Sequence, residues 1–374
     1  MARAPVAGPV PVTFVISHAL SGGSERYLEL LLDHLDPGWV HGVVSLQDGP
    51  FVARLRASGF EVHVVETGAR LSMLGSALRL RRLLARHPPA VIHANGVKAA
   101  LVAALARPAA PVVWVKHDFS WDGALAALVA RRCARVVGVS EAVTESFHGR
   151  LRERVRVVHN GIPPIERERP MGRDAVEALM GPGGPVVILV GRIHPAKGQI
   201  ELVEAAPRIL ERRPDARFLL LGGEDPYQPR YARRVRDRIA QLGLTPAVFT
   251  RPHHPDAPGV MAGCDVAVMP SVPDERGMGR EGFGLVGLEA MRVDTPVVGY
   301  DGGALPEVLG DCAVLVPEGD RAALAHAIAD LLGDPERRDR LAACGRTLAG
   351  ERFTIDSTVA GMRECYAEVA SGGA

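Results

Sequence analysis

Hydrophobic residues in this chain alternate between two patterns from one end to the other. Short runs rich in Val, Ile and Leu are separated by longer stretches with apolar residues at helical spacing, such as 25–35 and 77–87. Runs that lack polar alternation are typical of parallel strands covered by helices on both faces. The first half of the chain contains such strand candidates at 10–17, 40–46, 61–66, 90–93, 111–116, 135–140 and 154–159.

A second series of the same kind begins at residue 186. Its strand candidates are 186–191, 216–223, 247–250, 265–270, 295–300 and 313–317. The helices expected between and after them include 198–213, 228–241, 284–292 and 320–333. Repeated strand–helix units predict an α/β fold of two tandem Rossmann-like domains, each with a doubly wound parallel sheet.

The segment 161–184 separates the two series and is rich in Pro, Gly and charge, which is typical of a linker at its start and end. We expect an N-terminal domain over 1–165 and a C-terminal domain over 183–354. Doubly wound sheets bind ligands beyond the carboxyl ends of their strands, at the switch point of strand order. Two such sheets facing each other would share one interdomain cleft, so residues that follow strands are the candidates for chemistry.

The composition fits a two-domain globular chain. It has 374 residues of which 47% are hydrophobic, and no segment is apolar for long enough to span a bilayer. Prolines at 5, 9 and 11 interrupt the apolar N-terminal stretch, which argues against a signal peptide. The five cysteines include no C-x-x-C pair, so we expect reduced thiols in a cytoplasmic protein. The high Ala, Arg, Gly and Pro content resembles that of high-GC bacteria.

Charge is distributed unevenly although the formal net charge is only +1. Residues 1–160 carry 19 basic against 12 acidic residues, and residues 161–374 carry 25 against 31. The basic excess is concentrated at 79–86 and 131–156. Two interpretations stay open. One is peripheral contact with anionic lipid on the inner membrane face, or with a phosphorylated acceptor; the other is ordinary solvated helix faces. We expect no nucleic-acid partner.

The strongest candidate motif is EGFGLVGLEAM, from Glu281 to Met291. Two glutamates are seven residues apart, and glycines at 282 and 284 let the backbone approach a ligand. A helix that opens near Gly284 would direct its first amides at the same place. Glu289, on its second turn, is suited to accept hydrogen bonds from vicinal hydroxyls such as those of a ribose. The alternative is a glycine-rich turn with solvated acids.

The second motif is VGRIHPAKG, in which a strand ends at Gly191 and a helix begins near Gly198. Arg192 and Lys197 bracket that helix N-terminus, which is a natural site for a diphosphate. Their charges could neutralise a departing nucleoside diphosphate. The alternative is a surface turn with two basic residues.

The N-terminal half offers weaker candidates at strand ends. Gly22 and Gly23 lie between the first strand and the first helix, and His117 and Asp118 follow the fifth strand. For the remaining polar residues at strand ends we favour a turn role over a ligand role; these are Asn95, His159 and Asn160.

Several catalytic motifs are absent from the sequence. It contains no D-x-D pair of the kind that holds a divalent metal on a diphosphate, no H-E-x-x-H, no G-x-S-x-G and no Walker A loop. We therefore expect no metal or other cofactor, with Arg192, Lys197 and helix amides taking the place of the metal.

The combination of these motifs resembles the retaining GT-B glycosyltransferases often called glycosyltransferase family 4. The specific part of the resemblance is G-R-x4-K-G at 191–198 together with E-x7-E at 281–289, followed by GG and PE at 302–307. The less specific part is SGGSE, VKHD, GVSEAV and HNGI in the first half. The resemblance covers nearly the whole chain.

The resemblance implies a role for each matching residue. Arg192 and Lys197 would contact the donor diphosphate, Glu289 the ribose and Glu281 the transferred hexose, while His117 would approach the sugar from the N-terminal domain. The expected catalytic residues are His117, Arg192, Lys197 and Glu281. The expected donor-binding residues are Gly22, Gly23, Gly191, Arg192, Lys197, Arg251, Pro252, Glu281, Gly282, Phe283, Gly284, Leu285 and Glu289.

The resemblance also implies a reaction. A hexose would pass from a nucleotide diphosphate sugar, with UDP as the default nucleotide, to a small-molecule, lipid or polysaccharide hydroxyl. The anomeric configuration would be retained by front-face attack, and the last helix, about 355–374, would return to the N-terminal domain. The segment 272–280 is longer and more charged than the commonest family form. Because Asp274, Glu275 and Arg280 could contact the donor or the acceptor, the resemblance does not determine which sugar is transferred.

Two other functions remain as alternatives. A nonhydrolysing nucleotide-sugar epimerase shares the two-domain fold and would need no acceptor. The second alternative is a non-catalytic binding module, although such a module has no physical need for the basic pair Arg192 and Lys197 or the acidic pair Glu281 and Glu289.

Overall fold

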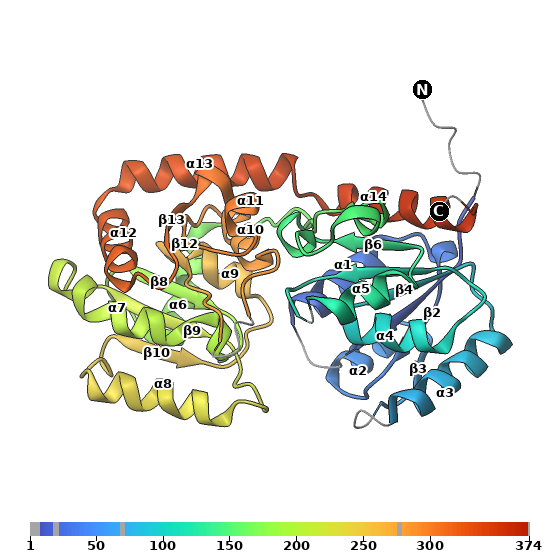
Figure 1. Cartoon of the computed structure of the whole chain (residues 1–374). Coiled ribbons are helices and arrows are strands. Elements are labelled where there is room, and N and C mark those ends of the chain that lie inside the picture. Colours follow the sequence, from blue (N-terminus) through green and yellow to red (C-terminus); the bar gives the residue numbers. More distant parts are fainter. Residues whose placement is uncertain (1–7, 18–21, 68–71, 121, 275–278, 373–374) are drawn as a thin grey trace. The chain divides into compact units, whose positions relative to one another are not determined.

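The computed structural model describes residues 8–17, 22–67, 72–120, 122–274 and 279–372. The chain divides into two compact units (Figure 1). The first unit comprises Met1–Gly161 and Ile355–Ala374, and the second comprises Ile162–Thr354.

The first unit is built on a seven-stranded parallel sheet with the strand order β3-β2-β1-β4-β5-β6-β7. The strands are β1 (Val12–Ile16), β2 (Val40–Ser45), β3 (Val62–Val64), β4 (Val91–Asn95), β5 (Val112–Lys116), β6 (Arg135–Gly138) and β7 (Val155–Val157). Strand order reverses between β1 and β4, which is therefore the switch point of this sheet.

Within the described residues, six α-helices accompany this sheet. They are α1 (Gly23–His34), α2 (Pro50–Ala57), α3 (Ser72–Arg86), α4 (Val97–Ala106), α5 (Ala124–Ala130) and α14 (Ile355–Ala370). Helix α14 packs against α1, and its buried Tyr366 hydroxyl lies 2.6 Å from Nδ1 of His93 on β4. The end of the chain is thus part of the first unit. Helices α3, α4 and α5 share one core cluster with β-strand residues such as Val15 and Trp114.

The second unit has a six-stranded parallel sheet with the order β10-β9-β8-β11-β12-β13. The strands are β8 (Val186–Val190), β9 (Arg217–Leu221), β10 (Val248–Arg251), β11 (Val266–Met269), β12 (Val297–Asp301) and β13 (Val314–Pro317). Its switch point lies between β8 and β11.

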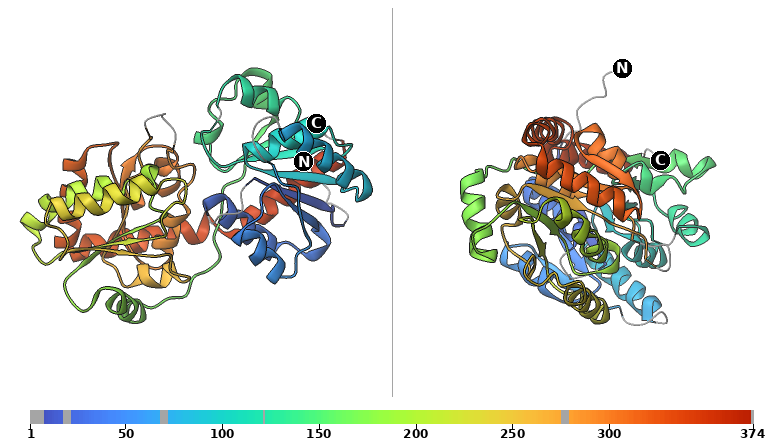
Figure 2. Two further views of the ribbon diagram at one scale, coloured as in Figure 1. Left: turned by 90° about the horizontal axis from the view of Figure 1, so that it is seen from below. Right: turned by 90° about the vertical axis from the view of Figure 1, so that its left-hand side faces the viewer.

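Helices cover both faces of each sheet, as the two further views show (Figure 2). In the second unit α7 (Gln199–Arg212), α8 (Pro229–Gln241) and α12 (Arg321–Gly333) share a core cluster with one face. The remaining α-helices are α6 (Arg169–Met180), α9 (Ala257–Ala262), α10 (Leu285–Arg292), α11 (Leu305–Leu309) and α13 (Pro335–Glu351). Short 3₁₀ turns are η1 (Pro37–Trp39), η2 (Ala142–Thr144), η3 (Gly149–Arg154), η4 (Pro195–Lys197) and η5 (Gly310–Cys312).

The predicted fold class is confirmed: two parallel α/β sheets follow one another along the chain. Each predicted strand is present within a few residues of its expected bounds. The segment 161–184 holds more than a connection, because α6 lies in it. Gly172 of α6 fits against Gly263 behind α9 so closely that an added Cβ would lie 2.4 Å from the Gly263 nitrogen.

The prediction that all cysteines are reduced thiols is wrong for one pair. Cys312 in η5 and Cys344 in α13 form a disulfide, with their Cα atoms 5.2 Å apart. The two cysteines are 32 positions apart in the sequence, and they meet only because the fold brings α13 back to η5, so the pairing was not predicted. The free cysteines are Cys133, Cys264 and Cys365, all of them buried.

Candidate functional site

The switch point of the second unit brings a lysine and a glutamate together. Lys197 follows β8 in η4, and Glu281 lies in the loop between β11 and α10. Because β8 and β11 are neighbours, these two loops leave the sheet side by side. Lys197 Nζ lies 2.7 Å from Glu281 Oε2, and Ser271 Oγ donates to the same oxygen at 3.1 Å.

The surroundings keep Glu281 ionised. Its side chain is 14% exposed, and that of Lys197 is 35% exposed. Burial by itself would raise the pKa of Glu281. The attraction of Lys197 and the hydrogen bonds from Lys197 and Ser271 outweigh burial, so the pKa lies below its ordinary value. The pair therefore presents a fixed positive and a fixed negative group at the edge of the sheet.

Arg192 is anchored next to this pair by a buried carboxylate. Its Nη1 lies 2.9 Å from Oδ2 of Asp225, which follows β9, and the backbone N–H of Tyr227 donates to the other oxygen at 2.8 Å. Gln199 in the first turn of α7 donates from Nε2 to the Arg192 carbonyl at 2.8 Å.

The pKa of His194 is affected by Asp225, Arg192 and Lys197 together, so these three side chains lie close to it. Burial lowers its pKa, the charge of Asp225 raises it, and the charges of Arg192 and Lys197 lower it further. Two cations thus lie at the beginning of α7, where helix amides also point outward.

Glycines allow the loops of the site to approach one another. Gly198 has a φ of +68°, and a Cβ there would lie 1.8 Å from the Pro270 carbonyl oxygen. Gly303 has a φ of +59°, and a Cβ there would lie 2.3 Å from the Glu281 carbonyl oxygen. That carbonyl accepts a hydrogen bond from the Ala304 N–H at 2.8 Å. The GG motif at 302–303 thus lets the following loop pack against the backbone of Glu281 and hydrogen-bond to it. The sequence motif did not predict this role.

The rest of the EGFGLVGLEAM segment leads into α10. Gly284 caps the helix with a φ of +98°, Leu285 is its buried first residue, and Gly282 is buried in the preceding turn. The Phe283 ring is buried and packs edge-on against Phe353. Glu289 is half-buried on the second turn of α10.

Arg251 ends β10, two strands away from β8. Its guanidinium donates to the backbone carbonyls of Leu179 at 2.7 Å and Thr250 at 2.9 Å. Since both bonds hold the side chain against backbone, it is the main chain of Arg251 and the exposed Pro252 that could frame a base.

A second group of predicted residues lies at the switch point of the first unit. Gly22 caps α1, and a Cβ on Gly23 would meet open space. His117 follows β5, and its Nε2 lies 2.6 Å from Oδ1 of Asn95 at the end of β4. Burial lowers the pKa of His117 to about 4, so its imidazole is neutral at ordinary pH.

Some partners of the candidate residues escaped the sequence analysis. Asp225 lies in GGED directly after β9, and this strand-end glycine pattern could have indicated it. Ser271 and Lys116 carried no such signal. Lys116 is buried and pairs with Asp122 at 2.9 Å, which ties down the loop after His117.

The charged segment before Glu281 is only partly described. Arg280 lies 3.3 Å from Glu318, and Asp274 has an interaction within the described residues. Glu275 lies outside the described residues. The predicted site residues are therefore divided: Gly22, Gly23 and His117 belong to the first unit and all others to the second.

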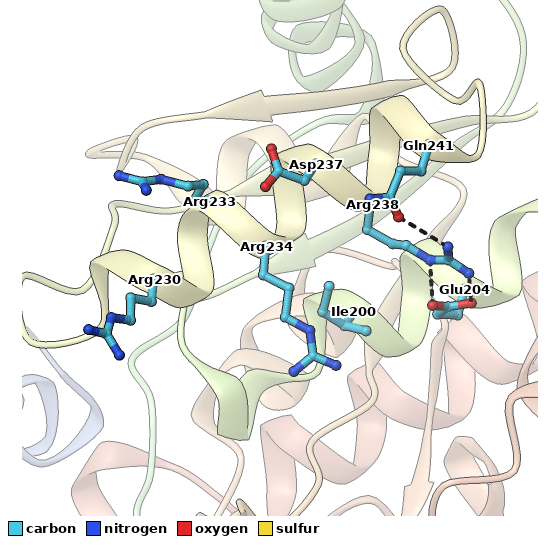
Figure 3. Close-up of a pocket in the computed structure, with 8 residues that line it drawn as sticks. All are labelled: Ile200, Glu204, Arg230, Arg233, Arg234, Asp237, Arg238 and Gln241. Atoms are coloured by element: carbon cyan, nitrogen blue, oxygen red, sulfur yellow. Dashed lines mark hydrogen bonds and ion pairs between the residues drawn. The ribbon is translucent and has the colours of Figure 1, made fainter.

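A separate hollow of about 490 Å³ lies between α7 and α8 (Figure 3). Its lining includes Arg230, Arg233 and Arg234, and Arg238 faces Glu204 with N–O distances of 2.6 and 3.0 Å. None of the predicted site residues lines this hollow.

The described residues hold neither a metal-binding cluster nor a membrane-spanning helix. They contain no group of three or more His, Cys, Asp and Glu side chains arranged to hold a metal ion. No helix among them combines the length and the hydrophobicity needed to cross a bilayer.

Comparison with known proteins gives consistent matches to both halves of the chain. Residues 21–165 match the family described as Glycosyltransferase Family 4, and residues 184–334 match Glycosyl transferases group 1. The GDP-mannose-dependent alpha-(1-6)-phosphatidylinositol monomannoside mannosyltransferase of Mycolicibacterium smegmatis is 30% identical over 358 residues, which is 87% of this chain and 89% of that protein.

Other relatives match over a shorter length. The D-inositol 3-phosphate glycosyltransferase of Nocardia farcinica is 35% identical over 59% of this chain, and the alignment spans about half (49%) of that protein. Among solved structures, Anabaena HepE in complex with UDP and glucose superimposes with a TM-score of 0.84 at 24% identity. That superposition covers 95% of this chain and 99% of HepE.

Proposed function

Because the chain belongs to glycosyltransferase family 4, we propose that it transfers a hexose from a nucleotide diphosphate sugar to a hydroxyl acceptor. The observation that carries this proposal is the Lys197–Glu281 pair at the switch point, with Arg192 anchored beside it. A diphosphate is stabilised by cations, and the hydroxyl groups of a sugar donate hydrogen bonds to carboxylates. Both kinds of group lie beyond the carboxyl ends of the strands, where doubly wound sheets bind ligands.

Each residue has a distinct role in the proposed reaction. Arg192, Lys197 and the amides at the start of α7 and α10 bind the diphosphate and stabilise the charge that develops on it as the glycosidic bond breaks. Glu281 accepts hydrogen bonds from the transferred hexose and Glu289 from the ribose. The Lys197–Glu281 contact holds both side chains in place before the donor arrives.

Retention of anomeric configuration follows if the acceptor attacks from the face that the diphosphate leaves. In that reaction the departing phosphate oxygen takes the proton of the acceptor hydroxyl, so no separate nucleophile is required. The imidazole of His117 is neutral at ordinary pH, so it would contact a substrate without adding charge.

For the donor we propose a UDP-hexose. The UDP-glucose complex of HepE supports it through the shared fold. The mannosyltransferase relative, which is GDP-mannose-dependent, makes GDP-mannose the competing donor. Direct competition between the two nucleotide sugars for one site distinguishes them.

We also propose that transfer needs no divalent metal, since Arg192 and Lys197 supply positive charge at the diphosphate. A transfer assay with a panel of nucleotide sugars and polyol or lipid acceptors tests both metal independence and retention of configuration. The expected result is turnover that survives EDTA, with the α-linked donor giving an α-linked product by NMR. A β-linked product would end the retaining assignment, and a strict need for added Mg²⁺ or Mn²⁺ would end the metal-free one.

An epimerase of the same fold predicts a different outcome. Incubation with a nucleotide sugar alone would then produce its epimer, whereas the proposed transferase leaves the sugar configuration unchanged and requires an acceptor.

We propose peripheral contact with the inner, cytoplasmic face of a membrane through α3. Leu74 and Leu78 lie one turn apart on this helix and are 61% and 53% exposed, and exposed arginines follow at 79, 81, 82 and 86. Exposed leucines beside arginines are typical of helices that lie on anionic lipid. The lipid acceptor of the mannosyltransferase relative is compatible with such a location.

A further inference from the structure

The amide of Asn95 is held in one orientation by the backbone. Its Nδ2 donates to the carbonyl oxygen of Ser24 in α1 at 3.2 Å. A backbone carbonyl can only accept, so the nitrogen of the amide must face Ser24 and the oxygen must face the other way. Asn95 is 3% exposed, and its own carbonyl accepts from Ser17 Oγ at 3.1 Å, so the residue is fixed at both ends.

The oriented oxygen determines which nitrogen of His117 carries the proton. Asn95 Oδ1 lies 2.6 Å from Nε2 of His117. An amide oxygen cannot donate, so Nε2 must be the protonated nitrogen. In a neutral ring the lone pair then lies on Nδ1, which has no hydrogen-bond partner within the part of the chain that the structure describes.

The ring is also held in its plane. The Tyr27 ring of α1 packs edge-on against it, with centroids 4.9 Å apart and an interplanar angle of 62°. The ionisable groups around it are Lys116, Asp118, Tyr27 and His93. Burial, together with the charge of Lys116, keeps the ring neutral against the opposing charge of Asp118.

We propose that Asn95 is a positioning residue that holds His117 as the neutral Nε2–H tautomer and leaves Nδ1 to accept a hydrogen bond from a substrate hydroxyl. This assignment rests on the proposed function for the identity of the ligand as a sugar or polyol. It excludes His117 as a proton donor or as a cation at the diphosphate, because Nε2–H is engaged and Nδ1 carries no proton.

The tautomer is measured without any substrate. In histidine-selective ¹⁵N spectra of the whole protein, the His117 ring is identified by its disappearance in His117→Gln. We expect Nδ1 to resonate as the bare nitrogen and Nε2 as the protonated one throughout about pH 6 to 8. An Nδ1–H tautomer, or a charged ring at neutral pH, would overturn the proposal.

Two substitutions of Asn95 then test its role in turnover. Asn95→Leu removes the anchor of Nε2–H and should lower kcat/KM by about tenfold or more. Asn95→Asp keeps an acceptor for Nε2–H but places a carboxylate beside the ring, which raises the pKa of His117. Activity of this variant should therefore fall as the pH is lowered through that raised pKa, while the wild type stays flat.

Thr13→Val is the matched control, because Thr13 is equally buried and its Oγ1 lies 3.1 Å from a different histidine, His41. It should leave the His117 signals and the pH profile unchanged. If Asn95→Asp gains activity at low pH, or if both Asn95 variants keep wild-type rates and profile, the proposal is wrong. If the wild type transfers no sugar at all, the proposed function fails while the spectra still decide the tautomer.

Discussion

Lys197 and Glu281 come from two loops that are 84 residues apart and share one short contact. Their sequence motifs were recognisable because glycines mark the turns on which both depend. Their mutual contact was not predictable from spacing, since it depends on β8 and β11 being neighbours in the sheet. The same applies to the Arg192–Asp225 pair, which depends on β8 lying beside β9.

Glu281→Gln tests the electrostatics of this contact. The pKa of Glu281 is lowered in the folded protein, so its stabilising contribution is present above the unfolded value and is lost as the pH falls through the folded value. The difference in unfolding free energy between wild type and Glu281→Gln should be constant near neutral pH and shrink below about pH 4.5. Urea unfolding at several pH values measures it.

Glu336→Gln serves as the control, because Glu336 is 90% exposed and its one ion pair among the described residues is with Arg340, at 3.8 Å. Its stability should follow the wild type at each pH. A Glu281→Gln difference that stays constant down to about pH 3 would contradict the assigned ion pair.

At the scale of elements, the helices best predicted from sequence are those bounded by glycine or proline. Gly198 precedes α7, Pro229 begins α8 and Gly284 caps α10. Helix α6 was harder to predict because its residues lie in a Pro- and Gly-rich segment, and only packing against α9 shows that they belong to the second unit.

Gly198→Ala tests how tightly α7 joins the sheet. Gly198 and Gly243 have the same φ of +68°, but only at Gly198 would a Cβ meet the Pro270 carbonyl, at 1.8 Å. Gly243→Ala should cost about 1–2 kcal/mol from the left-handed backbone alone. Gly198→Ala should cost clearly more and weaken nucleotide binding, as measured by urea unfolding and calorimetry. Equal costs for the two variants would contradict the close approach.

The disulfide joins η5 to α13 and can be counted chemically. The denatured, unreduced protein should expose three thiols to a thiol reagent and five after reduction. Since the bond closes a loop of 32 residues, its loss in Cys312→Ser/Cys344→Ser should cost about 4 kcal/mol by chain entropy. Five thiols without reduction would show that the bond does not form.

At the scale of the whole molecule, the sequence predicted two parallel-sheet units from hydrophobic runs alone, because buried parallel strands need no polar alternation. Long-range pairings such as Cys312–Cys344 could not be predicted this way, since they depend on how helices return to the sheet. The charge difference between the two halves was visible in the sequence, whereas the exposed leucines on α3 required the structure.

Those leucines carry the membrane prediction. Wild-type protein should sediment with anionic vesicles, and binding should weaken with salt because surface charges are screened. Leu74→Ser/Leu78→Ser should lower vesicle affinity by at least about tenfold, because two leucine side chains that become buried in the lipid are replaced by polar serine. Met171→Ser, at a residue 58% exposed in the second unit, is the control. Equal binding by the control and the leucine variant would contradict contact through α3.

The central claim is that the two cations at the beginning of α7 bind a nucleoside diphosphate. Binding of UDP, followed by thermal unfolding and calorimetry, tests it most directly in wild type, Lys197→Met and Arg238→Met. Arg238 is a suitable control because it also pairs with a glutamate, Glu204, but in the separate hollow between α7 and α8.

At a hundred times its dissociation constant, UDP should add about 2.7 kcal/mol to the stability of wild type and of Arg238→Met. Lys197→Met should lose most of that gain. If UDP, GDP, ADP and TDP all leave the wild type unchanged, or if Lys197→Met is stabilised as much as the wild type, the account of this site is wrong.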